Sequence, residues 1–344
     1  MKVANNLHES IGNTPLIRVP SLSDFTGTNI YIKCEHLNPG GSVKDRAALQ
    51  MVLDAIETGK LKPGMSIIEG TAGNTGIGLS LVGASMGYDV KIVMPNNQSK
   101  DKERMIRLYG GDLKLVDPAP FKEERHFYHT AKKMAAEKPE RYWWADQFEN
   151  LSNQKAHYLN TGPEIIEQLD RVDHFISTSG SGGTIAGVSK SLKEHNAKTK
   201  VQLIDPYGSG LKHFFDHGEF KSFGSSFTEG IGIMRLVNNF KEAKVDSTIR
   251  LPDEVLVAIA YFVKKHDGIV LGLSSALNLA GAFYAALFAE KGSNIVTISC
   301  DLGERSHAKL YSEEFLQEKS IPTEIDSIEN LANLVKEEGQ KVLK

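Results

Sequence analysis

Short apolar runs alternate along most of the chain with longer segments whose apolar residues recur at helical spacing. The short runs have the length of buried strands, and glycine, proline or polar residues bound them. This alternation is typical of βαβ units and of a parallel sheet covered on both faces, so we predict an α/β fold with parallel-rich sheets. The predicted strands are 29–33, 66–69, 89–95, 113–116, 174–177, 200–204 and 294–299, and the predicted helices are 44–58, 74–86, 101–109, 162–169, 184–193, 253–265 and 275–289.

The last part of the chain differs in character, because it holds one amphipathic helical pattern. Asp326 precedes Glu329 at the spacing of a capping box, which predicts the start of a helix. We predict a helical tail over residues 321–344 that packs on the protein or contacts a second copy, with a regulatory role as the alternative. Four apolar residues share one face of this helix: Ile328, Leu331, Leu334 and Val335.

Composition narrows the class of protein. The chain has 344 residues, of which 40% are hydrophobic and 24% charged, as in an ordinary soluble protein. Its 40 basic residues are dispersed and the formal charge is −3, which gives no footprint for nucleic acid or an anionic membrane. Cys34 and Cys300 are its only cysteines, and no metal site is predicted from them or from His213 and His217. Since the first residues lack the apolar core of a secretory signal, we expect a cytoplasmic protein.

The segment Asn38–Arg46 contains the first candidate for chemistry. Its Pro-Gly-Gly breaks the chain, and Ser42 is the predicted N-cap of the helix that follows. Lys44 then lies in the first helical turn, where the helix dipole disfavours a cation and lowers the pKa of the amine. An amine that must lose its proton to form a Schiff base benefits from this position. A surface lysine beside a turn is the alternative.

Two further glycine-rich turns each stand between a predicted strand and a predicted helix. In Glu69–Gly76, the side chains of Thr71, Asn74 and Thr75 offer donors beside free helix N–H groups, which suits a carboxylate. Ser179–Thr184 offers backbone N–H groups at a helix start, which suits a phosphate. A tight turn without a ligand is the alternative for both. Neither is a dinucleotide fingerprint, because the final glycine of GxGxxG is absent.

Taken together, these segments resemble the cysteine synthase/cystathionine β-synthase family of pyridoxal-phosphate (PLP) enzymes. The resemblance covers about residues 5–320 and includes Gln147 as the family's substrate-loop glutamine. The individual motifs are weak alone, but their common order makes coincidence implausible. The matching segments are Ile11–Leu16, Asn38–Arg46, Thr71–Gly76, Asp146–Phe148, His157, Thr161–Ile165, Gly180–Thr184 and Gly230–Gly232.

The resemblance implies the two-domain fold type II of the tryptophan synthase β-subunit. Residues 1–45 and 151–320 would form a large PLP-binding domain, and residues 46–150 a small mobile domain that closes over the substrate. A homodimer is implied, with serine acetyltransferase as a candidate partner. No haem-binding extension or C-terminal regulatory domain is expected.

The resemblance also implies roles for individual residues. Lys44 would hold PLP as a Schiff base and act as the catalytic base, and Asn74 would contact the phenolic oxygen of the ring. The PLP phosphate would bind Gly180, Ser181, Gly182, Gly183 and Thr184. The substrate carboxylate would bind Thr71, Ala72, Gly73, Asn74 and Thr75, together with Gln147 and Gly230.

The implied reaction is β-replacement or β-elimination on a β-substituted L-amino acid through an α-aminoacrylate. Cysteine synthase, which converts O-acetyl-L-serine and sulfide to L-cysteine and acetate, is the leading expectation. L-Cysteine desulfhydrase, which releases sulfide, pyruvate and ammonia, is the principal alternative. A serine/threonine dehydratase and a catalytically weak binding partner are further alternatives.

The sequence departs from the usual cysteine synthase at several positions. Gly70 and Ala72 replace a proline and a serine, and Ala276 replaces a glycine. Asp301 stands where the family usually has a serine facing the pyridine nitrogen, and a carboxylate there favours a protonated ring that withdraws electrons more strongly. The alternative is that Asp301 turns to solvent or pairs with Arg305. Because these features resemble a subgroup that includes cysteine desulfhydrases, we expect elimination to rival synthesis.

Overall fold

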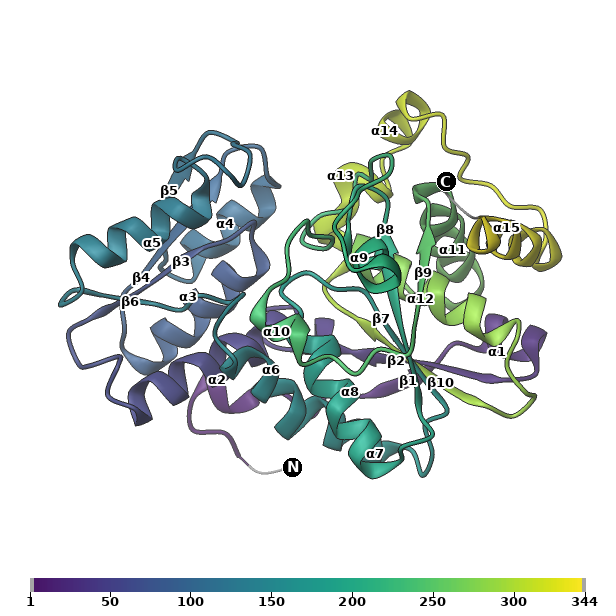
Figure 1. Ribbon diagram of the computed structural model, residues 1–344, viewed down its shortest axis with the longest axis horizontal. Coiled ribbons are helices and arrows are strands. Elements are labelled where there is room, and N and C mark those ends of the chain that lie inside the picture. Colours follow the sequence, from purple (N-terminus) through teal and green to yellow (C-terminus); the bar gives the residue numbers. More distant parts are fainter. Residues whose placement is uncertain (1–2, 342–344) are drawn as a thin grey trace.

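The computed structural model describes residues 3–341 and contains two sheets, each covered by helices (Figure 1). The larger sheet has six strands in the order β1-β2-β10-β7-β8-β9. Its neighbours pair in parallel except for β1 and β2, which are antiparallel. The strands are β1 (Leu16–Arg18), β2 (Asn29–Cys34), β7 (His174–Ser177), β8 (Lys200–Pro206), β9 (Ser247–Leu251) and β10 (Asn294–Ser299).

The smaller sheet has four strands, all parallel, in the order β5-β4-β3-β6. They are β3 (Ser66–Gly70), β4 (Val90–Pro95), β5 (Asp112–Val116) and β6 (Tyr142–Trp144). This sheet lies on the left of Figure 1 with α3 (Asn74–Met86), α4 (Lys100–Leu108) and α5 (Phe127–Glu137) around it. The helix α2 (Lys44–Glu57) connects the two parts, because it packs against both α3 and α6 (Ser152–Ala156).

The remaining helices pack on the larger sheet or surround it. Among them, α12 is almost wholly buried, since most of its residues belong to the main hydrophobic core. These helices are α1 (Pro20–Thr26), α7 (Gly162–Gln168), α8 (Gly183–His195), α9 (Leu211–His217), α10 (Asn238–Lys241), α11 (Asp253–Asp267), α12 (Leu273–Ala286), α13 (His307–Leu310), α14 (Glu313–Glu318) and α15 (Ile328–Gln340). Short helical turns lie at Leu7–Ser10, Glu35–Leu37, His157–Thr161 and Gly303–Ser306.

The predicted α/β fold with parallel-rich sheets is confirmed, and each predicted strand and helix has a counterpart. The tail helix α15 packs on α11 and α12 and buries Leu331 and Val335 in the main core. Residues 342–344 of the predicted tail, and the first two residues of the chain, lie outside the described residues. The pattern did not predict β1, β6, β9, α1 or α5. The strands β1 and β6 have only three residues each, and β9 alternates apolar with polar residues instead of forming an apolar run.

Both predicted helix caps are wrong by one residue. The N-cap of α2 is Val43 rather than Ser42, although Ser42 Oγ accepts a hydrogen bond of 3.3 Å from the backbone N–H of Lys44. The N-cap of α15 is Ser327 rather than Asp326, and its side chain accepts from the N–H of Asn330. Serine caps a helix as well as aspartate does, so the capping-box spacing alone did not distinguish Ser327 from Asp326.

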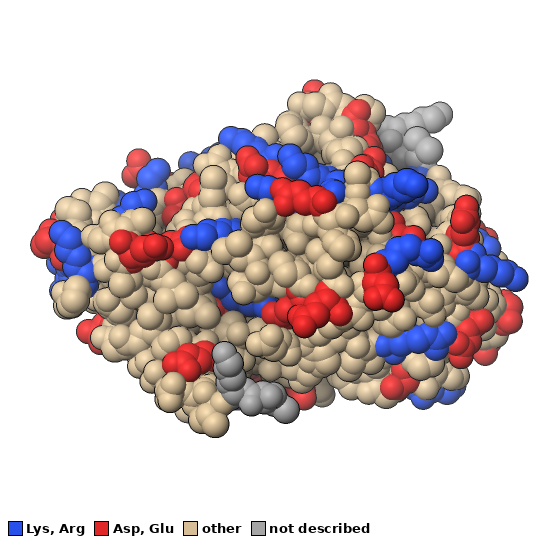
Figure 2. Space-filling model, turned by 90° about the horizontal axis from the view of Figure 1, so that it is seen from below, with Lys and Arg blue, Asp and Glu red and all other residues tan. Residues whose placement is uncertain are grey.

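The surface carries both signs of charge. Figure 2 shows Lys and Arg side chains beside Asp and Glu side chains across the face drawn, without a continuous basic area. Within residues 3–341, no helix has the length and apolar character needed to cross a membrane. The same part of the chain has no cluster of three or more His, Cys, Asp or Glu side chains suited to a metal ion.

Candidate active site

One cavity brings together the glycine-rich segments that the sequence singled out. Lys44 reaches it from the start of α2, Thr71–Thr75 from the start of α3, and Ser179–Gly182 from the start of α8. Asp301, which follows β10, forms a further part of the wall. The carboxyl ends of β3, β7 and β10 therefore converge here, as is usual for ligand sites in parallel sheets. Gln147, Gly230 and Thr184 also line the cavity, whereas Gly183 does not.

Lys44 has the environment of an amine that loses its proton easily. Burial lowers the pKa of its amine, although Cys300 and Asp301 act in the opposite direction. The direction agrees with the sequence prediction, but its main cause is removal of the amine from water and not the helix dipole. Burial also raises the pKa of the Cys300 thiol to about 11, so this neighbour stays neutral at pH 7.

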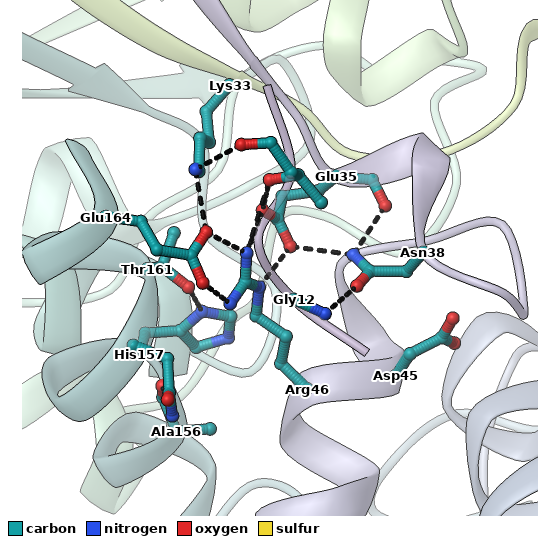
Figure 3. Close-up of polar contacts among 12 residues, drawn as sticks. Gly12, Lys33, Glu35, Asn38, Asp45, Arg46, Ala156, His157, Thr161 and Glu164 are labelled. Carbon is teal, nitrogen blue, oxygen red and sulfur yellow. Dashed lines mark hydrogen bonds and ion pairs between the residues drawn. The ribbon is translucent and has the colours of Figure 1, made fainter. Parts of the chain in front are cut away.

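A buried polar network around Arg46 anchors the first turn of α2 (Figure 3). The Arg46 guanidinium pairs with Glu35 Oε2 at 2.6 Å and with Glu164 Oε1 at 2.7 Å. Lys33 Nζ pairs with the other oxygen of Glu164 at 2.7 Å, and Asn38 Nδ2 donates to Glu35 Oε2 at 2.9 Å. Because these contacts join β2, α2 and α7, they fix the position from which Lys44 enters the cavity.

The turn before α8 is tightly packed and leads into a helix start, where the first backbone N–H groups have no partner within the helix. Gly182 has φ 86°, and a Cβ there would clash with the backbone of Phe240. Thr184 Oγ1 lies 3.2 Å from Nε2 of His157, whose Nδ1 lies 2.9 Å from Thr161 Oγ1. Burial, reinforced by the charges of Arg46 and Lys44, lowers the pKa of His157 well below its usual value. The ring is therefore neutral.

Asp301 is held by Asn74 and is separate from Arg305. Asn74 Nδ2 donates to Asp301 Oδ2 at 2.9 Å, and Arg305 Nη1 donates to Asn74 Oδ1 at 2.9 Å. Arg305 also donates to the carbonyl of Gly40. The Asp301 side chain is buried on the cavity wall, so it neither turns to solvent nor pairs with Arg305. Its Oδ1 atom has no hydrogen-bond partner among the described residues.

The sequence analysis missed an ion pair on the cavity wall. Lys102 Nζ of α4 pairs with Glu229 Oε2 at 2.6 Å, and both residues line the cavity. The Lys102 chain lies against Gly73, where a Cβ would clash with it. Glu229 Oε1 also pairs with Lys309 Nζ at 2.9 Å. The position of Glu229 directly before Gly230 was the only local signal.

The residues present fit PLP. Ser179 Oγ, beside the start of α8, and Asp301 Oδ1 are buried polar atoms of the cavity wall without a hydrogen-bond partner among residues 3–341. Orphaned buried atoms of this kind are rare unless a ligand satisfies them. The Lys44 amine loses its proton easily, which suits a bond to the carbonyl carbon of PLP. The start of α8 suits its phosphate, and the Asp301 carboxylate suits its pyridine nitrogen.

Fold and donor set together define a PLP-binding enzyme of the fold type II class. The chain matches the family of pyridoxal-phosphate dependent enzymes over residues 7–301 and belongs to this family. Its cofactor is accordingly PLP.

Several relatives match nearly the whole chain. Cysteine synthase 2 of Schizosaccharomyces pombe is 42% identical over 95% of this chain and 89% of its own length. The structure of cysteine synthase from Entamoeba histolytica superposes with a TM-score of 0.85 at 34% identity, covering 97% of this chain and 96% of that one. The structure of a hydrogen sulfide-producing enzyme from Fusobacterium nucleatum superposes with a TM-score of 0.80 at 31% identity, covering 89% and 98%.

Proposed function

We propose that the protein is a cysteine synthase that converts O-acetyl-L-serine and sulfide to L-cysteine and acetate. The proposal depends on one observation: Lys44, the Thr71–Thr75 loop and the turn before α8 line the same cavity. Similarity to cysteine synthases over nearly the whole chain supports the choice of substrate.

Bound PLP supplies an acceptor for the electron pair left at the substrate Cα. Lys44 would hold its carbonyl carbon, Asn74 its phenolic oxygen and Asp301 its ring nitrogen. The start of α8, Gly180–Thr184, would hold the phosphate through backbone N–H groups and hydroxyls.

The chain's own residues then bind the substrate and move its proton. The start of α3 offers backbone N–H groups and the hydroxyls of Thr71 and Thr75 to the substrate carboxylate, beside Gln147 and Gly230. The Lys44 amine, with its lowered pKa, takes the Cα proton and can return it.

The test measures cysteine formed from O-acetyl-L-serine and sulfide by the PLP-loaded protein. We expect steady turnover, and we expect Lys44→Ala to abolish it while leaving the fold intact by circular dichroism. A PLP-loaded wild-type protein that forms no cysteine would contradict the proposal.

L-Cysteine desulfhydrase is the second candidate, favoured by the carboxylate of Asp301 and by the likeness to a hydrogen sulfide-producing enzyme. The same preparation should be given L-cysteine alone, and sulfide and pyruvate should be followed. Sulfide release faster than cysteine synthesis would make elimination the main activity. Pyruvate or 2-oxobutyrate from serine or threonine would instead support a dehydratase.

We further infer that the four-stranded sheet unit, about residues 46–150, closes over the substrate, and that the larger sheet belongs to a PLP-binding domain. A cytoplasmic homodimer with serine acetyltransferase as a partner follows from the same family resemblance. Light scattering of the pure protein, alone and mixed with a serine acetyltransferase, tests both assemblies. A monomeric mass in each sample would contradict them.

A further inference from the structure

Glu69 is a fully buried carboxyl group immediately behind the loop that precedes α3. It lies near the end of β3 and is 0% exposed. Its Oε1 accepts a hydrogen bond of 3.2 Å from Gln147 Nε2, while Oε2 has no partner among residues 3–341. Buried carboxyl groups are uncommon unless they are fully paired, so this group requires an explanation.

A chain of hydrogen bonds leads from Glu69 to the cavity. The Thr75 hydroxyl donates to Gln147 Oε1 at 2.6 Å, so Gln147 links Thr75 to Glu69. Both Gln147 and Thr75 line the cavity. The amide of glutamine has an acceptor oxygen and a donor nitrogen of nearly equal shape, so a half-turn of the amide reverses the direction of the chain.

The protonation of Glu69 determines which direction is allowed. An ionised carboxylate only accepts, so the amide nitrogen of Gln147 must face it and the amide oxygen must face Thr75. The single proton of Thr75 is then used inside the chain, and only lone pairs of its hydroxyl face the cavity. A protonated Glu69 can also donate to the amide oxygen, in which case the amide nitrogen turns to Thr75 and the Thr75 proton becomes free.

We propose that Glu69 is a positioning residue that sets whether Thr75 meets a substrate carboxylate as a donor or as an acceptor. The inference rests on the proposed docking of that carboxylate at Thr71–Thr75. Two acceptors facing each other repel, whereas a hydroxyl donor facing a carboxylate forms a strong charge-assisted hydrogen bond. Binding of a carboxylate should therefore draw one proton onto Glu69.

The surroundings of Glu69 let this proton exchange near neutral pH. Burial, together with the charge of Asp146, raises the pKa of Glu69 to about 8, while the hydrogen bond from Gln147 Nε2 and the nearby backbone N–H groups of Asp146 and Gln147 oppose the rise.

Other charged groups near this region are paired, neutral or exposed, and Lys132 and Lys133 of α5, which packs on β3, are among the exposed ones. Tyr128 of α5 donates to Asp146 Oδ1 at 3.2 Å, and Arg235 pairs with Glu149 at 2.5 Å beside it. Burial lowers the pKa of His126 to about 4, so this ring is neutral. The neighbouring elements α3 and β6 carry no charged residue, and the charged side chain of β4, Lys91, pairs with Asp112.

The test uses propionate, a carboxylate without an amino group, and the PLP-loaded protein. Its Kd is measured by titration calorimetry from pH 6 to 10, in buffers of different ionisation enthalpy so that proton uptake is also obtained. Above about pH 8, where the pKa of Glu69 lies, the wild-type Kd should rise by up to about tenfold per pH unit, with uptake approaching one proton. Glu69→Gln should lose both this Glu69-dependent rise and the proton uptake that accompanies it.

Asp146→Asn provides a second, independent variant. Asp146 has φ 49°, a conformation that asparagine also tolerates, so the substitution should preserve the backbone. Removing this negative charge lowers the pKa of Glu69, so the rise in Kd should begin at a lower pH. Equal pH dependence in the wild type and Glu69→Gln, or an unchanged onset in Asp146→Asn, would overturn the inference. Propionate that fails to bind the wild type at any pH would overturn the proposed carboxylate docking, and the inference with it.

Discussion

Asn74 Nδ2 donates a hydrogen bond of 2.9 Å to Asp301 Oδ2, and this contact joins the start of α3 to the segment after β10. The amide orientation is fixed, because Arg305 donates to the oxygen of the same amide. Asp301 therefore keeps one oxygen occupied by Asn74 and one free at the cavity wall. A substitution at Asp301 changes both a charge on the cavity wall and the contact between α3 and the segment after β10.

We expect Asp301→Ser to lower the ratio of elimination to replacement. The carboxylate favours a protonated ring nitrogen, and a serine does not, so cofactor and enzyme together withdraw electrons less strongly. We expect this ratio to fall on the order of tenfold, which corresponds to about 1.4 kcal/mol in the difference between the activation free energies of elimination and replacement. Pyruvate and cysteine are measured from O-acetyl-L-serine in the presence of sulfide. Asp301→Asn, which keeps the shape without the charge, should act in the same direction, and an unchanged ratio in both variants refutes the role of the charge.

The ion pair between Lys102 and Glu229 should favour the closed cavity. It joins α4, beside the smaller sheet, to the segment before Gly230, and the Lys102 side chain is 8% exposed. We expect Lys102→Met to raise KM for the amino-acid substrate by about tenfold and to change kcat less, because a smaller fraction of the protein is competent to bind. Steady-state kinetics on the PLP-loaded protein measures the separation of KM from kcat.

Lys309→Met is the matched control for this prediction. Lys309 pairs with the other oxygen of Glu229 at 2.9 Å, but it lies on α13, outside the smaller sheet and its helices. Its loss removes one charge without breaking the contact to α4, so KM should change little. An equal rise in KM for both variants would show that total charge matters rather than the connection to α4.

The sequence predicted the parts of the site that depend on local pattern. Lys44 and the turn at Ser179–Thr184 follow from glycine-rich segments that open helices, and both line the cavity. The contact between Lys102 and Glu229 joins positions 127 apart, so no local pattern contains it. Glu69 ends a predicted apolar strand, where a charged residue is ordinarily exposed, so both its burial and its contact with Gln147 follow only from the fold.

Asp45 should make the protein less stable as the pH rises. It is 0% exposed, its Oδ2 accepts from the N–H of Gly40 at 2.6 Å, and burial raises its pKa from 3.8 to about 7. A carboxyl with a raised pKa binds its proton more tightly when folded, so the stability it contributes at low pH is lost between about pH 4 and pH 7. The loss amounts to at most about 1.4 kcal/mol per pH unit.

Asp45→Asn keeps the acceptor for Gly40 and cannot ionise. Its free energy of unfolding should therefore fall less between pH 4.5 and 7.5 than that of the wild type. Urea denaturation at the two pH values measures this difference. Parallel decreases in the two proteins would exclude Asp45 as the cause.

His157 should carry its proton on Nε2 when PLP is bound. If Thr184 donates its only proton to the phosphate, its oxygen must accept from His157 Nε2, which lies 3.2 Å away. The ring is neutral because its pKa lies well below the usual value, so Nδ1 must accept from Thr161 Oγ1 at 2.9 Å. The ¹⁵N shifts of the ring identify the tautomer, and a proton on Nδ1 in the PLP-loaded protein contradicts this arrangement. His157→Gln offers Thr184 another donor, whereas His157→Leu offers none and should weaken PLP binding by about tenfold, the effect of one lost hydrogen bond.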